Sequence, residues 1–183
     1  QSGAPTKFLR AAEVHKELNV KVPMSNLPAE YENLKEEIDS AIRRVIESGS
    51  FVLGKEVRVF EEELAEYCGT RHAVGVGSGT AAIHLALLAC GIGPGDEVIT
   101  VPNTDIPTTM TISHCGADIV WVDVDGKSFN MDPGRIEEKV TEQTKAILPV
   151  HLFGHPADMD PIMEVAERHD LLVIEDAALA MGA

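Results

Sequence analysis

The sequence has no long apolar run, and none of its runs approaches the roughly 20 residues that a helix needs to cross a bilayer. Its first residues also lack the charged-then-apolar order of a secretory signal. Basic residues are scarce, at 15 against 30 acidic ones, which gives a net charge of −15 with no basic patch. Such a charge repels nucleic-acid backbones and anionic membranes. We therefore expect a soluble, cytoplasmic protein with no nucleic-acid partner and no membrane partner.

Cysteine is also scarce. Cys68, Cys90 and Cys115 are odd in number, and none has the spacing of a metal site, so neither a disulfide framework nor a zinc site is expected. We expect reduced, buried thiols. His151 and His155 are four residues apart, but the Gly154-Pro156 stretch argues against a helix between them. We therefore expect core or loop histidines and no metal site.

With 183 residues and 44 % apolar content, the chain could bury one ordinary core. Residues 1–25 are less patterned and are interpreted as an N-terminal arm or linker, and residues 26–183 as one domain. From residue 72 onward, short apolar runs rich in β-branched residues alternate with helical segments. The runs are HAVGV (72–76), EVITV (97–101), DIVWVDV (118–124), AILPVHLF (146–153) and LLVIE (171–175). This alternation predicts an α/β fold with a three-layer, mostly parallel sheet covered on both faces.

Helices are predicted from the apolar spacing and from end signals. Residues 30–49 place apolar side chains at helical spacing and stop at a glycine, and residues 55–69 repeat that pattern. The pairs Asp132-Pro133 and Asp160-Pro161 each offer a capping carboxylate followed by a proline of the first turn, so we expect a helix to start at each.

In such sheets, ligands bind beyond the carboxyl ends of the strands. A glycine-rich turn follows the first apolar run and leads into a helix that starts near Gly79 and Thr80. Its free amides, with the hydroxyls of Ser78 and Thr80, can hold a phosphate; a tight turn capped by serine or threonine is the alternative. A dinucleotide fingerprint that starts at Gly75 would need a glycine at position 80, so a dehydrogenase-like site is disfavoured.

Two carboxylates stand at other junctions between strands and helices. Asp105 precedes Pro107 and is most simply a helix cap. Asp176 follows Glu175 at the end of a buried run, where a carboxylate has little water and needs a partner. A protonated pyridine nitrogen, as in pyridoxal phosphate, is one such partner. A cap on a following helix is the alternative.

Several blocks of the sequence, in the right order, resemble the DegT/DnrJ/EryC1/StrS family of pyridoxal-phosphate-dependent sugar aminotransferases. These blocks are SGSFVLGKEVRVFEEELAEYCGTRHAVGVGSGTAAIHLALLACGIGPGDEVITVP (48–102), GADIVWVDVD (116–125), TKAILPVHLFGHPADMDPI (144–162) and LLVIEDAALAMGA (171–183). The resemblance implies the large domain of a fold-type I transferase, here incomplete, and a homodimer. It also implies transfer of an amino group, usually from glutamate as the amino-acid donor, to a nucleotide-linked keto sugar.

Carried over by position, the resemblance implies that Gly79 and Thr80 hold the cofactor phosphate and that Asp176 pairs with the pyridine nitrogen. Two positions depart from the family pattern. Asp105 stands where an aromatic residue usually stacks on the cofactor ring, and Leu179 where a glutamine or histidine usually lies near the phenolic oxygen. Both contacts are therefore expected to be missing or supplied by other groups.

The family's catalytic lysine, which forms a Schiff base with the cofactor, is expected beyond Ala183. All eight lysines precede Asp176, and none is at a matching position: Lys7, Lys16, Lys21, Lys35, Lys55, Lys127, Lys139 and Lys145. We therefore expect the 183 residues alone to be inactive and to be a piece of a longer enzyme. A naturally split enzyme and a noncatalytic binding or regulatory module on the same fold are the alternatives.

Overall fold

The structure is a computed structural model that describes residues 23–183. The predicted N-terminal arm therefore lies, as far as residue 22, outside the described residues. The chain divides into two compact units, Gln1–Val59 and Phe60–Ala183, and each is described by itself. None of the helices in the described part is both long and apolar enough to span a bilayer.

The first unit contains α2 (Leu27–Ser48) and the start of α3 (Lys55–Tyr67). The Asn26 side chain caps α2 by accepting a hydrogen bond of 3.4 Å from the Ala29 amide. Gly49 ends the helix with a φ of 65°, a left-handed conformation in which a glycine avoids the strain of a Cβ atom. Both helices were predicted from their apolar spacing, and both predictions are confirmed.

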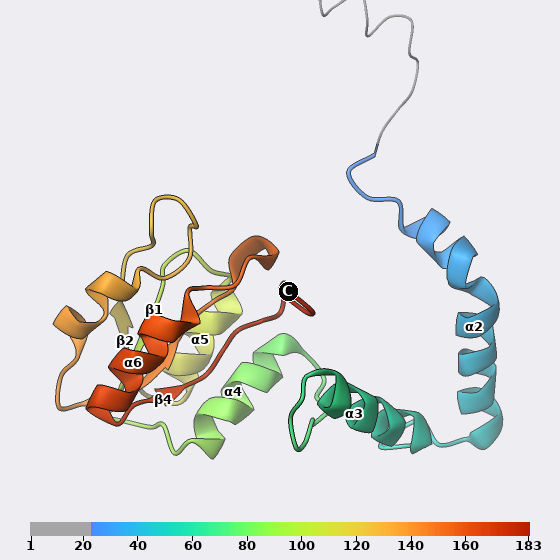
Figure 1. Cartoon of the computed structure of the whole chain (residues 1–183). Helices are drawn as coiled ribbons and strands as arrows, with labels where there is room; N and C mark the ends of the chain where they lie inside the picture. The colour runs from blue at the N-terminus through green and yellow to red at the C-terminus, as the bar shows by residue number, and fades with distance from the viewer. Residues whose placement is uncertain (1–22) are drawn as a thin grey trace, which may run out of the picture. The chain divides into compact units, whose positions relative to one another are not determined.

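The second unit is built on a four-stranded parallel sheet with the strand order β2-β1-β3-β4 (Figure 1). Its strands are β1 (Glu97–Thr100), β2 (Asp118–Trp121), β3 (Thr144–Leu148) and β4 (Leu172–Val173). In register, Val98 of β1 pairs with Ile119 of β2 and with Ala146 of β3. The central strands are buried on both faces, which explains why they read as continuous apolar runs.

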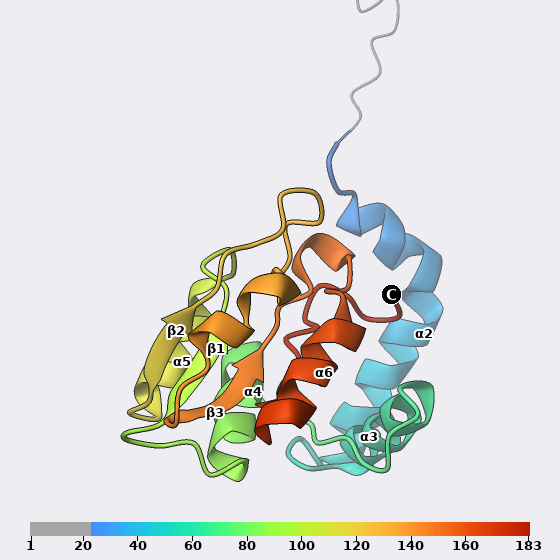
Figure 2. The ribbon, with the colours of Figure 1, turned by 60° about the vertical axis from the view of Figure 1, so that its left-hand side comes forward.

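Helices cover both faces of this sheet. They are α4 (Gly79–Ala89), α5 (Ile106–His114) and α6 (Met159–His169), with short 3-10 turns at Pro133–Arg135, Glu137–Lys139 and Leu152–Gly154. Helix α5 leads from β1 outward to β2, and α6 leads from β3 outward to β4, in the opposite direction. Right-handed crossovers in opposite directions place their helices on opposite faces, as Figure 2 shows. The α/β fold with a three-layer parallel sheet is confirmed.

The core lies between these layers. Many of its most buried side chains come from β1, β3, α4, α5 and α6, and include Leu87, Val98, Ile99, Ile112, Ile147, Leu148 and Ile162. Thr100, at the end of β1, is also buried, and its hydroxyl donates a hydrogen bond of 2.8 Å to the Leu148 carbonyl. This bond ties β1 to β3 where the two strands end.

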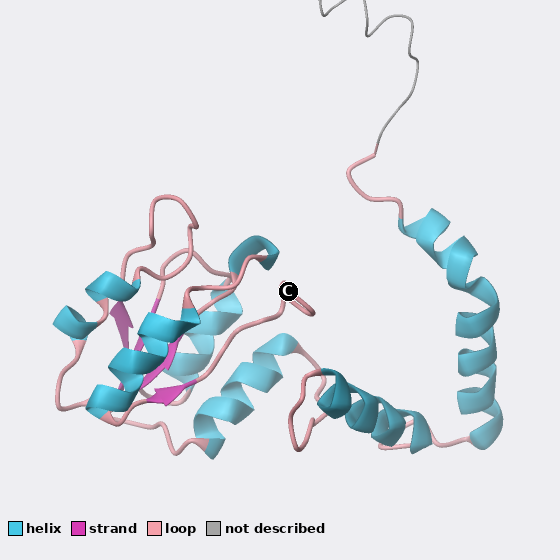
Figure 3. Ribbon diagram, viewed as in Figure 1, coloured by secondary structure: helices cyan, strands magenta, loops and turns pink. Residues whose placement is uncertain are grey.

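The predicted strand at residues 72–76 is wrong. Ala73–Val76 has no ladder partner among the described residues and is drawn as a loop between α3 and α4 (Figure 3). Val74 is 78 % exposed, and the Gly75 amide donates a hydrogen bond of 2.7 Å to the Glu61 carboxylate. A strand exists only through its neighbours, so an apolar β-branched run is not sufficient to form one.

Two of the predicted helix starts need correction. Asp132 does cap a helix, since its carboxylate accepts a hydrogen bond of 3.0 Å from the Gly134 amide, but the helix is a single 3-10 turn. Helix α6 begins with Asp158 as its N-cap residue, two residues before the predicted Asp160. Pro161 fits inside that first turn because the amide it lacks would have no partner within the helix.

The cysteine prediction is only partly right. All three are free thiols, but Cys68 and Cys90 are exposed in the described chain. Cys115 is buried, and this burial raises the pKa of its thiol. Cys68 directly follows α3 and Cys90 is the C-cap of α4, so both lie at helix ends rather than on the core face.

Candidate functional site

A cleft of about 410 Å³ lies at the carboxyl edge of the sheet. It is lined by the start of α4, the start of α5 and the chain that follows β4. Four of the five predicted site residues line it together: Gly79, Thr80, Asp105 and Asp176. The fifth, Leu179, is not among the lining residues, and its side chain is 62 % exposed.

The start of α4 is an open helix end. Ser78 is its N-cap, and the Ser78 hydroxyl accepts a hydrogen bond of 3.1 Å from the Ala81 amide. Within the described chain, the amides of Gly79 and Thr80 have no acceptor. A Cβ atom placed on Gly79 would meet no heavy atom within 4 Å. Two unpaired amides at the positive end of a helix dipole suit an anion such as a phosphate.

Asp176 is held in place by its backbone. Its amide donates a hydrogen bond of 3.0 Å to the Pro149 carbonyl, and its carbonyl accepts one of 3.0 Å from the His151 amide. Its carboxylate Oδ2 accepts a hydrogen bond of 2.8 Å from the Thr108 hydroxyl. Its Oδ1 accepts a longer one, of 3.3 Å, from the Ala178 amide. The described residues after Asp176 form turns and no helix, so the carboxylate is not a helix cap.

Glu175, beside Asp176, is paired with a buried histidine. His151 is 4 % exposed, and its Nδ1 accepts a hydrogen bond of 3.0 Å from the Ala157 amide. Because Nδ1 is an acceptor, the ring proton is on Nε2, which donates to the Glu175 carboxylate at 2.9 Å. His155 is exposed. The prediction of a core or loop role for both histidines is confirmed.

Asp105 is the N-cap of α5, and its Oδ1 accepts a hydrogen bond of 2.9 Å from the Ile106 amide. The predicted cap role is therefore confirmed. The same residue also lines the cleft, although a carboxylate cannot stack as an aromatic ring does. Asp105 is a cap that borders the site.

Thr108 and Thr104 are polar neighbours of the cleft that sequence reasoning missed. Thr108 is 1 % exposed, lines the cleft and bonds to Asp176, and its hydroxyl lies 2.8 Å from the Thr104 hydroxyl. Their spacing of four residues gave little signal, because Thr104 precedes the N-cap residue Asp105 and lies outside the helix. The carboxylate to which Thr108 bonds, moreover, lies 68 residues away in the sequence.

Comparison with known proteins identifies the family. Residues 32–183 match the model of the DegT/DnrJ/EryC1/StrS aminotransferase family. The chain belongs to this family. The resemblance in the sequence blocks is thereby confirmed, and the described α/β fold is the one found in solved aminotransferases of the family.

One relative of this family member is the dTDP-3-amino-3,4,6-trideoxy-alpha-D-glucose transaminase of Streptomyces venezuelae, 50 % identical over 163 residues. That match covers 89 % of the chain and 43 % of the relative. The crystal structure of DesV from S. venezuelae aligns with a TM-score of 0.86 at 50 % identity, over 88 % of the chain and 43 % of DesV. The NtdA structure from Bacillus subtilis, with bound cofactor PMP, aligns with a TM-score of 0.83 at 37 % identity, over 90 % of the chain and 39 % of NtdA. The chain thus spans less than half the length of these relatives.

Proposed function

We propose that this family member, as a whole protein, is a pyridoxal-phosphate-dependent aminotransferase that transfers an amino group from glutamate to a nucleotide-linked keto sugar. Family membership and the names of its relatives support the reaction and the class of substrate. We further propose a cytoplasmic homodimer in which residues 26–183 form part of the large domain and residues 1–25 an arm or linker.

One observation of the structure carries the proposal. An open helix start, at Gly79 and Thr80, and a carboxylate held at a strand end, Asp176, line the same cleft. The first suits a phosphate, and the second suits a protonated ring nitrogen. The cofactor has both groups, so the donor set of the cleft fits pyridoxal phosphate at two separate points.

Each residue then has a defined task. When bound, pyridoxal phosphate supplies an electron sink for the carbon that gives up a proton. The amides of Gly79 and Thr80, with the Thr80 hydroxyl, hold the phosphate. Asp176 holds the proton on the ring nitrogen. Asp105 and Leu179 replace the usual aromatic and hydrogen-bonding residues. The contacts that residues 1–183 make with the cofactor are therefore those to its phosphate and the one from Asp176.

None of the described lysines lines the cleft, so the described residues offer no amine base for the proton transfer at this site. We therefore propose that residues 1–183 alone do not catalyse the reaction, and that a lysine from the remainder of the protein completes the site. An uncharged amine is the expected base and nucleophile in this chemistry.

The test uses the full-length protein. Titration with pyridoxal phosphate is expected to produce a visible absorption band that neither component gives alone, and glutamate with a nucleotide-linked keto sugar is expected to give the amino sugar. The same assay on residues 1–183 is expected to show no turnover. If the full-length protein gave no band at saturating cofactor but still bound the nucleotide sugar, the protein would be a noncatalytic binding module and not an enzyme.

A further inference from the structure

Two threonines form a series of hydrogen bonds that ends at the Asp176 carboxylate. Thr108 lies in the first turn of α5, and its hydroxyl donates to the Asp176 carboxylate at 2.8 Å. The Thr104 hydroxyl lies 2.8 Å from the Thr108 hydroxyl. Thr108 is almost fully buried and Thr104 is half-buried. These hydrogen bonds therefore link the segment after β1 and the first turn of α5 to the segment that follows β4.

The donor and the acceptor of each of these hydrogen bonds follow from the chemistry of the groups. An ionised carboxylate can only accept hydrogen bonds, so the single hydroxyl proton of Thr108 must point to Asp176. The Thr108 oxygen is then free to accept, and the Thr104 hydroxyl must be its donor. Each hydroxyl strengthens the next hydrogen bond by polarising it, so the two hydrogen bonds are cooperative.

The two carboxylate oxygens of Asp176 are therefore not equivalent. Oδ2 has the short bond from Thr108, whereas Oδ1 has the 3.3 Å contact from the Ala178 amide, which is beyond the usual range for an amide donor. Oδ1 retains acceptor capacity for a ligand in the cleft. A carboxylate without the Thr108 bond could rotate and present either oxygen.

We propose that Thr108, supported by Thr104, is a positioning residue that holds Asp176 so that Oδ1 receives the proton on the cofactor ring nitrogen. The inference rests on the proposed function and adds Thr108 as the group that orients the Asp176 carboxylate. Precise orientation matters here because a displacement of about 1 Å at a reacting group can cost roughly a hundredfold in rate.

Helix α5 supplies a matched control. Thr111 is also fully buried, but its hydroxyl donates to the Thr108 backbone carbonyl, at 3.0 Å, and bonds to no carboxylate. Thr108→Val and Thr111→Val make the same change of shape and both remove a buried hydroxyl. Only Thr108→Val removes a bond to Asp176.

The experiment measures cofactor binding by the full-length protein. After the cofactor has been removed, the dissociation constant of pyridoxal phosphate is determined from the absorption band. We expect Thr108→Val to raise it about tenfold, the effect of one hydrogen bond to a charged group. Thr108→Ser keeps the hydroxyl and is expected to stay within about twofold of wild type, as is Thr111→Val. If Thr108→Val and Thr111→Val bound the cofactor equally well, the inference would be wrong.

A cofactor analogue separates positioning from general damage to the cleft. The 1-deaza analogue has a carbon in place of the ring nitrogen and cannot bond to Asp176. Thr108→Val is expected to bind this analogue as wild type does. An equal loss for cofactor and analogue would overturn the inference.

Two further outcomes are also decisive. If Thr108→Val does not fold, Thr104→Val keeps Thr108 and removes only its donor; it is expected to weaken cofactor binding about threefold, which is roughly half of the effect in free energy. No change in that variant would overturn the inference. Wild-type protein that binds no cofactor would refute the proposed function itself, and the inference with it.

Discussion

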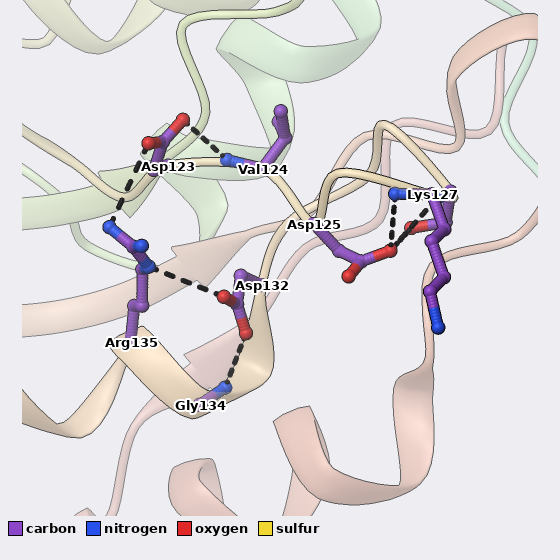
Figure 4. A network of polar contacts seen from close by, with 8 residues as sticks. Asp123, Val124, Asp125, Lys127, Asp132, Gly134 and Arg135 are labelled. Carbon is purple, nitrogen blue, oxygen red and sulfur yellow. Dashed lines mark hydrogen bonds and ion pairs between the residues drawn. The ribbon is translucent and has the colours of Figure 1, made fainter.

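Two acidic regions lie beyond the carboxyl ends of parallel strands, and they use their carboxylates differently. In the loop from Asp123 to Arg135, which follows β2, each carboxylate accepts from amides at most three residues ahead (Figure 4). These bonds run from Val124 to Asp123, from Lys127 and Ser128 to Asp125, and from Gly134 to Asp132. Asp176, after β4, instead takes its short bond from Thr108, 68 residues away. The loop carboxylates bond to amides of their own loop, whereas the short bond of Asp176 comes from a helix that is distant in the sequence.

The larger hollow is not the one beside Asp176. The hollow beside the loop, lined by Asp125 and Asp132, measures about 540 Å³, more than the 410 Å³ of the cleft at Asp176. Yet the amides of Ser128 and Lys127 hold the pKa of Asp125 below its ordinary value, and Arg135 pairs with Asp132 at 3.3 Å. Carboxylates that are already satisfied by their own loop have little left for a ligand. The two regions therefore differ in where the partners of their carboxylates come from, a difference that the volumes beside them do not reveal.

The largest expected effect comes from Asp176→Asn in the full-length protein. The amide cannot stabilise a proton on the ring nitrogen, so turnover is expected to fall roughly 10²–10³-fold with the fold intact. Asp132→Asn makes the same chemical change in the loop and is expected to leave turnover as in wild type. Steady-state amino transfer measures both. Equal activity of Asp176→Asn and wild type would remove the functional contrast between the two regions.

A second effect concerns the support of the Asp176 segment. His151→Ala leaves the buried Ala157 amide without its acceptor and is expected to lower the free energy of unfolding by about 1–3 kcal/mol. His155→Ala is the control, since that histidine is exposed and is expected to change stability little. Urea unfolding of the cofactor-free protein gives both values. A similar cost for the two variants would show that the buried bonds of His151 are unimportant.

Asp105 tests whether a carboxylate on the edge of the cleft is a ligand or a cap. Asp105→Ala is expected to cost about 1 kcal/mol of stability, and Asp105→Asn less, because asparagine also caps. Neither change is expected to weaken cofactor binding. Thermal unfolding measures the first effect and the absorption titration the second. A tenfold loss of cofactor affinity in Asp105→Asn would show that Asp105 contributes to cofactor binding.

The smallest effect is expected in the loop itself. Because the pKa of Asp125 is lowered in the folded protein, its carboxylate stabilises the fold above its ordinary pKa of 3.8, and this contribution is lost as the pH falls. Asp125→Asn should therefore be slightly less stable than wild type near neutral pH, and the difference should shrink in acid. Unfolding curves between pH 3 and pH 7 test this. A difference that is independent of pH would show that the charge is irrelevant.

Local chemistry made much of the fold predictable. The helix ending at Gly49 and the cap at Asp105 depend on groups within a few residues, and apolar spacing reveals buried faces. The same reasoning failed at Ala73–Val76, where β-branched residues predict a strand but no neighbouring strand pairs with them in the described chain. It also placed the start of α6 two residues late, since Asp158 and Asp160 are both acceptable starting residues.

The sequence by itself determined the class of the fold, the position of the glycine-rich helix start and the presence of a carboxylate at the end of an apolar run. It could do so because these features follow from the periodicity and conformational preferences of neighbouring residues. Only the tertiary structure decided that Thr108 is the partner of Asp176 and that the aspartates of the 123–135 loop are satisfied locally. A hydrogen bond between residues 68 positions apart depends on how strands and helices pack, and no local pattern encodes that distance.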